Sequence, residues 1–224
     1  MRRVRENGLS LAFGGLFLLA LLGQAFAGNA AVNDEREQAG QPAISLWDHV
    51  TSSRFAVDVT ENWQSEYLQF LLYILATIWL VQVGSPDSKK VGEEGPESDE
   101  TELTGPHAPA DAPRPVRSGG VLGALYSRSL GLAFGAVFVV SWLAQSIAGR
   151  VAYNQEQQLQ GSDELLTWGE YVLSPDFWDR TLQNWQSEFL AVGSITIFAV
   201  YLRQRGSSES KPVGEPHTTT GHTN

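Results

Sequence analysis

A five-residue stretch that occurs twice holds the residues of this chain best suited to polar chemistry. Its copies are Asn62-Trp63-Gln64-Ser65-Glu66 and Asn184-Trp185-Gln186-Ser187-Glu188, and each directly precedes an apolar run. Indole, amide, hydroxyl and carboxylate groups can all form hydrogen bonds where a helix enters a membrane. The motif predicts either a structural lock between a loop and its helices or a polar pocket with Glu66 and Glu188 as ionisable groups. If these glutamates lie close together, repulsion and burial raise their pKa values.

A second set of paired polar residues lies near the end of two earlier apolar runs: Gln24 and Gln145, then Asn33 and Asn154, then Glu35 and Glu156. An amide in lipid needs a hydrogen-bond partner, so we expect both glutamines to face a helix-bundle interior, as links between helices or as the lining of a polar path. The carboxylates and amides could together bind a divalent cation. Their spacing is not diagnostic of a metal site, and we assign neither a metal nor a cofactor.

The sequence lacks the residues and motifs that several kinds of chemistry require. The chain has no cysteine, which excludes disulfides, thiolate metal sites and a cysteine nucleophile. No recognised hydrolase, nucleotide-binding or zinc-protease motif occurs. His49 is the one histidine in the repeated regions, and its aligned counterpart is expected to be Glu170, which argues against paired haem or zinc ligands. The formal net charge of −10 argues against nucleic acid. We therefore predict that the protein is not an enzyme.

Four uncharged stretches carry most of the apolar residues: Asn7–Asn33, Tyr67–Pro86, Ser129–Gly149 and Phe189–Leu202. A membrane helix needs about 20 residues to cross roughly 30 Å of hydrocarbon, and the first three stretches are long enough. The fourth is short and needs help from its flanks. The sequence predicts an all-α integral membrane protein with four transmembrane helices.

The first and second halves of the chain resemble each other. Leu9–Gly40 aligns without gaps with Leu130–Gly161, one residue is expected to be inserted near Val172, and the match then resumes through the five-residue motif. This length of self-similarity indicates a duplication. It predicts two tandem two-helix units, 1–84 and 128–206, related by a pseudo-two-fold axis along the membrane normal. Between and after them, the polar linker 85–127 and tail 207–224 are predicted to be disordered, because they cannot bury enough apolar surface.

The amino-terminal stretch has an alternative interpretation. Arg2, Arg3 and Arg5 precede an apolar run that ends in Ala25-Phe26-Ala27, as in a cleavable signal peptide. The same pattern recurs deep inside the chain, where it cannot be a signal peptide. A membrane helix used twice explains both copies better.

The basic residues predict the orientation. Eleven of the fifteen lie in the amino terminus, linker and tail, and four lie in the segments 28–66 and 150–188. The positive-inside rule therefore predicts cytoplasmic termini and two outward-facing loops. These loops show helix signals. Ser174-Pro175-Asp176 predicts a helix that begins near Ser174 and continues into the fourth span, with Ser52–Val83 as its equivalent. Ser45-x-x-Asp48 and Thr167-x-x-Glu170 predict capping boxes.

These features resemble a family of small bacterial membrane proteins described only as a domain of unknown function. The resemblance is carried by Leu-x-Leu-Ala-Phe-Gly, beginning at Leu9 and Leu130, by the later Gln-x-x-Ala-Gly, and by the Asn-Trp-Gln-Ser-Glu motif. It implies a bacterial plasma (inner) membrane protein and brings no activity or catalytic residue.

Two functions remain open. The preferred one is a non-enzymatic structural or partner-binding role of the outer loops, with the lipid bilayer and either a second copy or another membrane protein as partners. It expects an aromatic patch from Trp47, Phe55, Trp168 and Trp178. The alternative is a small oligomeric transporter or channel, which expects the paired glutamines and glutamates to converge on the pseudo-two-fold axis.

Overall fold

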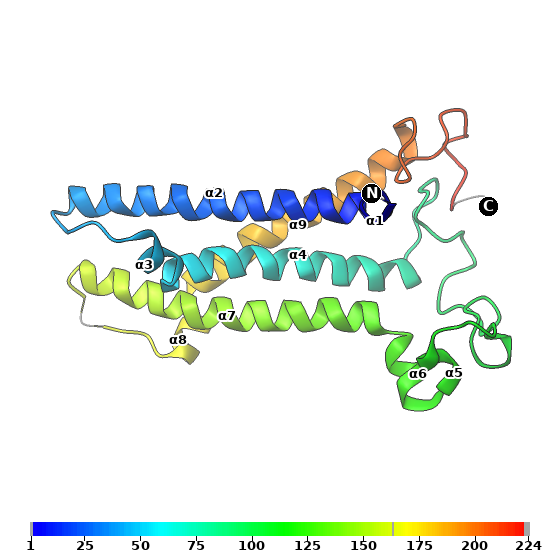
Figure 1. Cartoon of the computed structure of the whole chain (residues 1–224), viewed down its shortest axis with the longest axis horizontal. Coiled ribbons are helices and arrows are strands. Elements are labelled where there is room, and N and C mark those ends of the chain that lie inside the picture. The colour runs from blue at the N-terminus through cyan, green and yellow to red at the C-terminus, as the bar shows by residue number, and fades with distance from the viewer. Residues whose placement is uncertain (1, 163, 222–224) are drawn as a thin grey trace. The chain divides into compact units, whose positions relative to one another are not determined.

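The computed structural model describes residues 2–162 and 164–221, and within them the chain is helical with no strand (Figure 1). This agrees with the predicted all-α class. The helices are α1 (Arg2–Glu6), α2 (Gly8–Gln38), α3 (Leu46–Val50), α4 (Ser53–Trp79), η1 (Gly105–His107), α5 (Arg114–Ser118), α6 (Gly120–Tyr126), α7 (Ser129–Leu159), α8 (Trp168–Val172) and α9 (Pro175–Tyr201).

The chain forms two compact units, and each takes segments from both halves of the sequence. The first unit contains Met1–Thr60 and Ala144–Phe177, and the second contains Glu61–Leu143 and Trp178–Asn224. The unit boundaries fall within the long helices α4 and α7 and near the start of α9. Side chains from the two sequence halves therefore meet within each unit.

Helices α2 and α7 are long and apolar enough to cross a membrane. Helix α2 has 31 residues, of which Ala25 alone is buried among those described. The core helix of a soluble protein buries its apolar side chains, whereas α2 leaves Leu9, Leu19 and Phe26 more than half exposed. Apolar exposure of this extent is typical of a surface that contacts lipid or another protein.

Helices α4 and α9 begin in the predicted outer loops and continue into the other two apolar stretches. The Ser52 and Ser174 hydroxyls accept hydrogen bonds from the backbone N–H groups of Phe55 and Phe177, at 3.2 and 3.3 Å. The predicted helix from Ser174 is thus confirmed, with Pro175 as its first residue. Helix α4 ends at Trp79, before the expected end at Val83.

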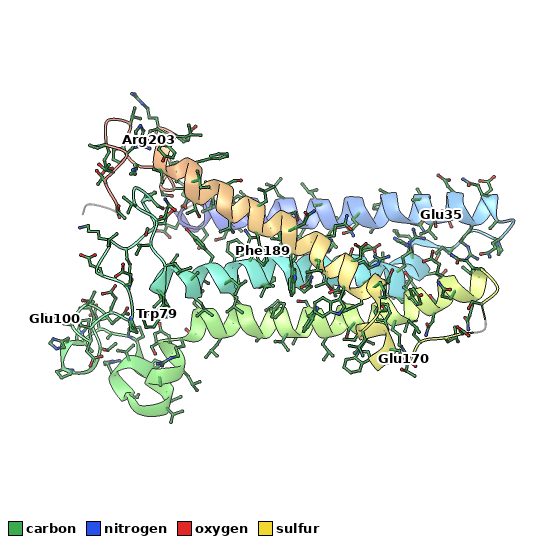
Figure 2. All side chains as sticks on the ribbon, turned by 180° about the vertical axis from the view of Figure 1, so that it is seen from behind. Glu35, Trp79, Glu100, Glu170, Phe189 and Arg203 are labelled. Carbon is green, nitrogen blue, oxygen red and sulfur yellow. The ribbon has the colours of Figure 1, made fainter. Side chains whose placement is uncertain are left out.

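The two predicted capping boxes are present at the starts of α3 and α8. The Ser45 hydroxyl accepts from the Asp48 N–H, and the Asp48 carboxylate accepts from the Ser45 N–H. Thr167 and Glu170 form the same pair of bonds, and Figure 2 labels Glu170 on α8. Each box satisfies backbone donors that a helix start leaves without a partner.

The capping boxes predict a pH dependence. Hydrogen bonds from the Ser45 and Thr167 hydroxyls, and then from their backbone N–H groups, hold the pKa values of Asp48 and Glu170 below their ordinary values. A lowered folded-state pKa contributes stability above the unfolded-state pKa, about 4 for these carboxyls. That stability is lost as the pH falls through the lowered value. We expect Glu170→Gln to reduce the loss of stability between pH 5 and 3, measured by denaturant titration at several pH values. An unchanged pH profile in Glu170→Gln would contradict this origin.

The linker and the tail each begin with a hydrogen-bonded turn. The Gln82 N–H donates to Ser88 Oγ at 2.8 Å, and the Gln204 N–H donates to Ser210 Oγ at the same distance. Gly84 and Gly206, two residues after these glutamines, both have positive φ, at 88° and 86°. Such local side-chain bonds and glycine turns are not visible in composition. Residues 222–224 of the tail lie outside the described residues.

The tail also covers the end of α9. The Lys211 side chain is buried, and its ammonium donates to the backbone carbonyls of Pro216, His217 and Thr219 at 3.0–3.2 Å. Arg203 lies where α9 passes into the tail (Figure 2), and its guanidinium donates to the carbonyl of Val200 at 3.1 Å. Cations near the carboxyl end of a helix satisfy its last carbonyls and favour its dipole.

Candidate functional site

The asparagines Asn33 and Asn154 brace the segments that follow α2 and α7. The Asn33 amide donates to the Ile44 carbonyl at 3.0 Å and accepts from the Ile44 N–H at 2.7 Å. Asn154 forms the same two bonds with Leu166, at 2.9 and 3.0 Å. Each side-chain amide pairs with the N–H and the carbonyl of one backbone residue, as a neighbouring strand does in a β-sheet. These two candidate residues therefore shape the outer loops.

A glycine in each long apolar helix contacts an aromatic side chain of the following short helix. A Cβ at Gly28 would lie 2.7 Å from His49 Nε2, and a Cβ at Gly149 would lie 2.5 Å from the Tyr171 hydroxyl oxygen. Both ring residues are buried. Only glycine leaves room for these contacts.

These contacts correct the alignment of the two halves. Gly28 and Gly149 are 121 positions apart, whereas His49 and Tyr171 are 122 apart, as are the capping serine and threonine. The counterpart of His49 is therefore Tyr171 and not Glu170. The extra residue lies between Gly161 and Leu166, and not near Val172. An insertion there is accommodated by a loop, since both the helix before it and the short helix after it keep their contacts.

The acidic candidates Glu35 and Glu156 differ in their partners. The Arg54 guanidinium binds Glu35 through two hydrogen bonds, at 2.6 and 3.0 Å, and these hold the pKa of Glu35 below its ordinary value. Glu35 lies beyond the uncharged stretch that ends at Asn33, and Figure 2 shows it on α2. Glu156 accepts from the Gln160 amide at 3.4 Å. Both carboxylates are exposed, and an exposed pair such as Arg54–Glu35 contributes about 0–1 kcal/mol.

A buried hydrogen bond joins the two copies of the Asn-Trp-Gln-Ser-Glu motif. The Trp185 indole N–H donates to Gln64 Oε1 at 2.9 Å. Gln64 has no exposed surface, whereas its counterpart Gln186 is exposed. An indole N–H can only donate, so it fixes which end of the Gln64 amide faces it. The copies therefore have different roles, although their sequences are identical.

Within the motifs, the serines and Asn184 bond to their own helices. The Ser65 and Ser187 hydroxyls donate to the carbonyls of Asn62 and Asn184, at 2.9 and 2.8 Å. The Asn184 amide donates to the Arg180 carbonyl at 3.0 Å. Trp63 is 38% exposed. These contacts favour the structural lock over a polar pocket.

Sequence reasoning missed an aromatic residue that supports this lock. Trp142 of α7 lies edge-on to Trp178, with ring centroids 6.2 Å apart, and Trp178 lies edge-on to Trp185 at 6.4 Å. Edge-to-face aromatic pairs add about 0.5–1.5 kcal/mol to the area that they bury. One signal in the sequence could have indicated Trp142: it is a tryptophan inside an apolar stretch, where the aligned residue of the other half is Leu21.

The remaining candidates do not converge on one path. Gln145 is fully buried, but Gln24 is exposed, contrary to the expectation that both glutamines face the interior. The reason is that α2 buries the face that holds Ala25, and the next side chain along a helix points about 100° away. Glu66, which directly precedes its apolar run, is exposed, and Glu188 is half-buried. In the described part of the chain, no group of three acidic or histidine side chains could hold a metal ion.

The buried bond predicts a rescue experiment. We expect Trp185→Phe to destabilise the protein by about 1–3 kcal/mol, because the buried Gln64 carbonyl loses its donor. Trp185→Phe/Gln64→Leu should recover part of this loss, since removing both polar partners is nearly neutral. Trp185→Phe/Gln186→Leu is the matched control and should recover nothing. The free energy of unfolding in detergent measures all three, and equal recovery in both double variants would contradict the lock.

Comparisons with known proteins add one result. Neither the curated proteins nor the solved structures contain a match to this chain. A family model does match, over residues 1–222, and it covers all the helices and both copies of the motif. The chain belongs to the family described as Domain of unknown function (DUF6766).

Proposed function

We propose that the protein is a non-enzymatic, four-span protein of the bacterial plasma membrane whose ordered outer loops bind another membrane protein. Helices α2 and α7 provide two spans. In α4 and α9 the helical apolar parts, Tyr67–Trp79 and Phe189–Tyr201, have 13 residues each, about 20 Å at 1.5 Å per residue. Adding the polar motif before each run gives 18 residues and about 27 Å. The motif's tryptophan then lies near the membrane interface, where tryptophan is enriched.

Recurring contacts support the duplication. The asparagine braces, capping boxes, glycine contacts and serine-bonded turns each occur twice, at positions 121 or 122 apart. Similar sequences can share helices by chance of composition, but shared side-chain contacts depend on exact register. The two sequence repeats, 1–84 and 128–206, have the same order of helices, so both enter the membrane in the same direction. The distribution of basic residues then places both termini and the linker in the cytoplasm.

The partner-binding role rests on one observation, the preorganised shape of both outer loops. Asn33 and Asn154 hold each loop by paired hydrogen bonds to its backbone, and the capping boxes fix the short helices that follow. The polar side chains singled out by the sequence are thus used mainly in holding structure. A rigid surface binds with little loss of conformational entropy.

Charge selects the class of partner. The segments 28–66 and 150–188 each hold seven acidic and two basic residues, so their combined charge of −10 equals that of the whole chain. Two copies would bring two acidic surfaces together, which electrostatics opposes. The outer surface therefore suits a partner with basic residues on the same side of the membrane. The expected aromatic patch is only partly present, because Phe55 and Trp178 are half-buried.

Crosslinking in intact cells tests this proposal. The chain lacks cysteine, so Leu165→Cys supplies a single crosslinking site on the outer loop, and the exposed Val91→Cys is the control on the linker side. We expect an adduct with a different, basic membrane protein from position 165. Its yield should fall at high salt and in the Glu37→Gln/Glu164→Gln background, since both charges are exposed. An adduct of two copies of this chain, or none from the folded protein, would reject the proposal.

A further inference from the structure

The short helices α3 and α8 lie at a defined height along the long apolar helices. Gly28, which contacts His49 of α3, is 20 residues after the start of α2 at Gly8. Gly149, which contacts Tyr171 of α8, is 20 residues after the start of α7 at Ser129. At 1.5 Å per residue, both contacts lie about 30 Å along their helices. That distance matches the thickness of a bilayer's hydrocarbon core, about 30 Å.

Arginines lie at both ends of the apolar stretch of α7 and before that of α2. Arg5 and Arg128 precede the apolar stretches of α2 and α7, and Arg150 follows Gly149 directly. Basic side chains at helix ends reach the headgroup region. The hydrocarbon core thus ends near Gly149, and both helices continue about 15 Å beyond the contact glycines, to Gln38 and Leu159. The chain then turns back, and α3 and α8 return to the level of the bilayer surface.

Each returning helix exposes a tryptophan there. Trp47 of α3 is 72% exposed, although His49 on the same helix is buried. Trp168 of α8 is 48% exposed, and its indole N–H donates to the Ser146 hydroxyl at 3.0 Å. Ser146 precedes Gly149 and so lies within the apolar stretch of α7. The bond ties the Trp168 indole to α7 and satisfies its only polar group.

We infer that α3 and α8 are interfacial helices that insert Trp47 and Trp168 into the lipid headgroup region of the outer leaflet. The occupant of their exposed aromatic surface is the bilayer itself, because this surface continues the apolar surface of α2 and α7 at the same height. Tryptophan favours this region, since its body is apolar and its N–H is polar. The assignment depends on the membrane insertion proposed above, and it takes Trp47 and Trp168 out of the partner-binding surface.

Depth measurement by spin labelling tests the inference. Single cysteines replace Trp47, Leu159 and Leu19 of the cysteine-free chain in lipid nanodiscs, and collisions with oxygen and with a water-soluble nickel chelate are compared. Trp47 and Leu159 are equally exposed, at 72%, so a difference in collision ratio reports their different distances from the hydrocarbon core. Leu19, 68% exposed and about 16 Å from the start of α2, reports the hydrocarbon core. We expect an oxygen-to-nickel collision ratio that is highest at Leu19, intermediate at Trp47 and lowest at Leu159.

Each other outcome has a distinct meaning. An aqueous ratio at Leu19 would reject membrane insertion and with it the proposed function. A lipid ratio at Leu19 with equal aqueous ratios at Trp47 and Leu159 would reject the interfacial helices alone. Because labelling removes the indole, native fluorescence is compared between the wild type and Trp47→Phe. Lipids brominated near the glycerol should quench a component that is missing in Trp47→Phe, and absence of this component would also reject the inference.

Discussion

Gly149→Ala is expected to destabilise the protein by overpacking the contact between α7 and α8. The added Cβ would lie 2.5 Å from the Tyr171 hydroxyl oxygen and 3.0 Å from two ring carbons. Tyr171 is only 1% exposed and packs against Tyr153 and Phe177, so its ring cannot move away. Overpacking of this kind costs about 1–3 kcal/mol. A fall in the midpoint of thermal unfolding, followed by tryptophan fluorescence in detergent, measures the effect.

The chain offers matched controls for this substitution. Gly193 is also in a long helix but has no atom within 4 Å of its would-be Cβ, so Gly193→Ala should be neutral or stabilise by up to about 1 kcal/mol. Gly28→Ala should fall between the two, because the nearest atoms of His49 belong to the tip of its ring. Equal midpoints for the variants at 149 and 193 would show that α8 does not pack against α7 as described.

Replacement of both bracing asparagines, Asn33→Leu/Asn154→Leu, is expected to release the outer loops. Each leucine keeps a similar size but removes two hydrogen bonds to the backbone of Ile44 or Leu166. The partly buried N–H groups of Ile44 and Leu166 then lose their acceptor and the Leu166 carbonyl loses its donor, at a cost of about 1–3 kcal/mol per site. The Ile44 carbonyl keeps only the longer bond from Asn29. Faster hydrogen exchange at the Ile44 and Leu166 amides reports the release directly.

Asn29→Leu is the control for this pair. Asn29 lies one turn before Asn33 and reaches the same loop, but its bonds to the carbonyls of Ile44 and Ser45 are longer, at 3.4 and 3.3 Å. Exchange at Ile44 should change little in this variant. If exchange stays slow when both bracing asparagines are replaced, the loops are ordered by other contacts, and the preorganisation argument for partner binding fails.

The sequence predicts those parts of the structure that depend on local spacing. Both capping boxes are recognisable because a hydroxyl and a carboxylate three residues apart can only meet across a first helical turn. The start of α9 follows from Ser174 and Pro175 in the same way. Asn33 and Asn154 are recognisable as important because they recur, but their backbone partners lie 11 and 12 residues away and depend on how each loop turns.

The burial of a side chain depends on which element packs against its face of the helix, and local spacing does not predict that element. Identical residues at Gln24 and Gln145, or at Gln64 and Gln186, differ in burial because their helices meet different neighbours. The channel alternative expected the two former glutamines to converge on one path, whereas in this chain Gln145 is buried and Gln24 is exposed. The insertion predicted near Val172 is misplaced, although the spacing of the two capping boxes, 122 positions from Ser45 to Thr167, already places the inserted residue before Thr167.

The topology of the chain is the most direct test of the proposed membrane protein. Leu159 and Leu103 are exposed; Leu159 is the last residue of α7, and Leu103 lies in the linker. Single cysteines at these positions are labelled with a membrane-impermeant maleimide, in intact and in permeabilised cells. Four spans predict that Leu159→Cys is labelled in intact cells and that Leu103→Cys is labelled only after permeabilisation. If α2 and α7 are the only spans, both results are reversed, which would contradict the four-span arrangement and the outward position of the loops.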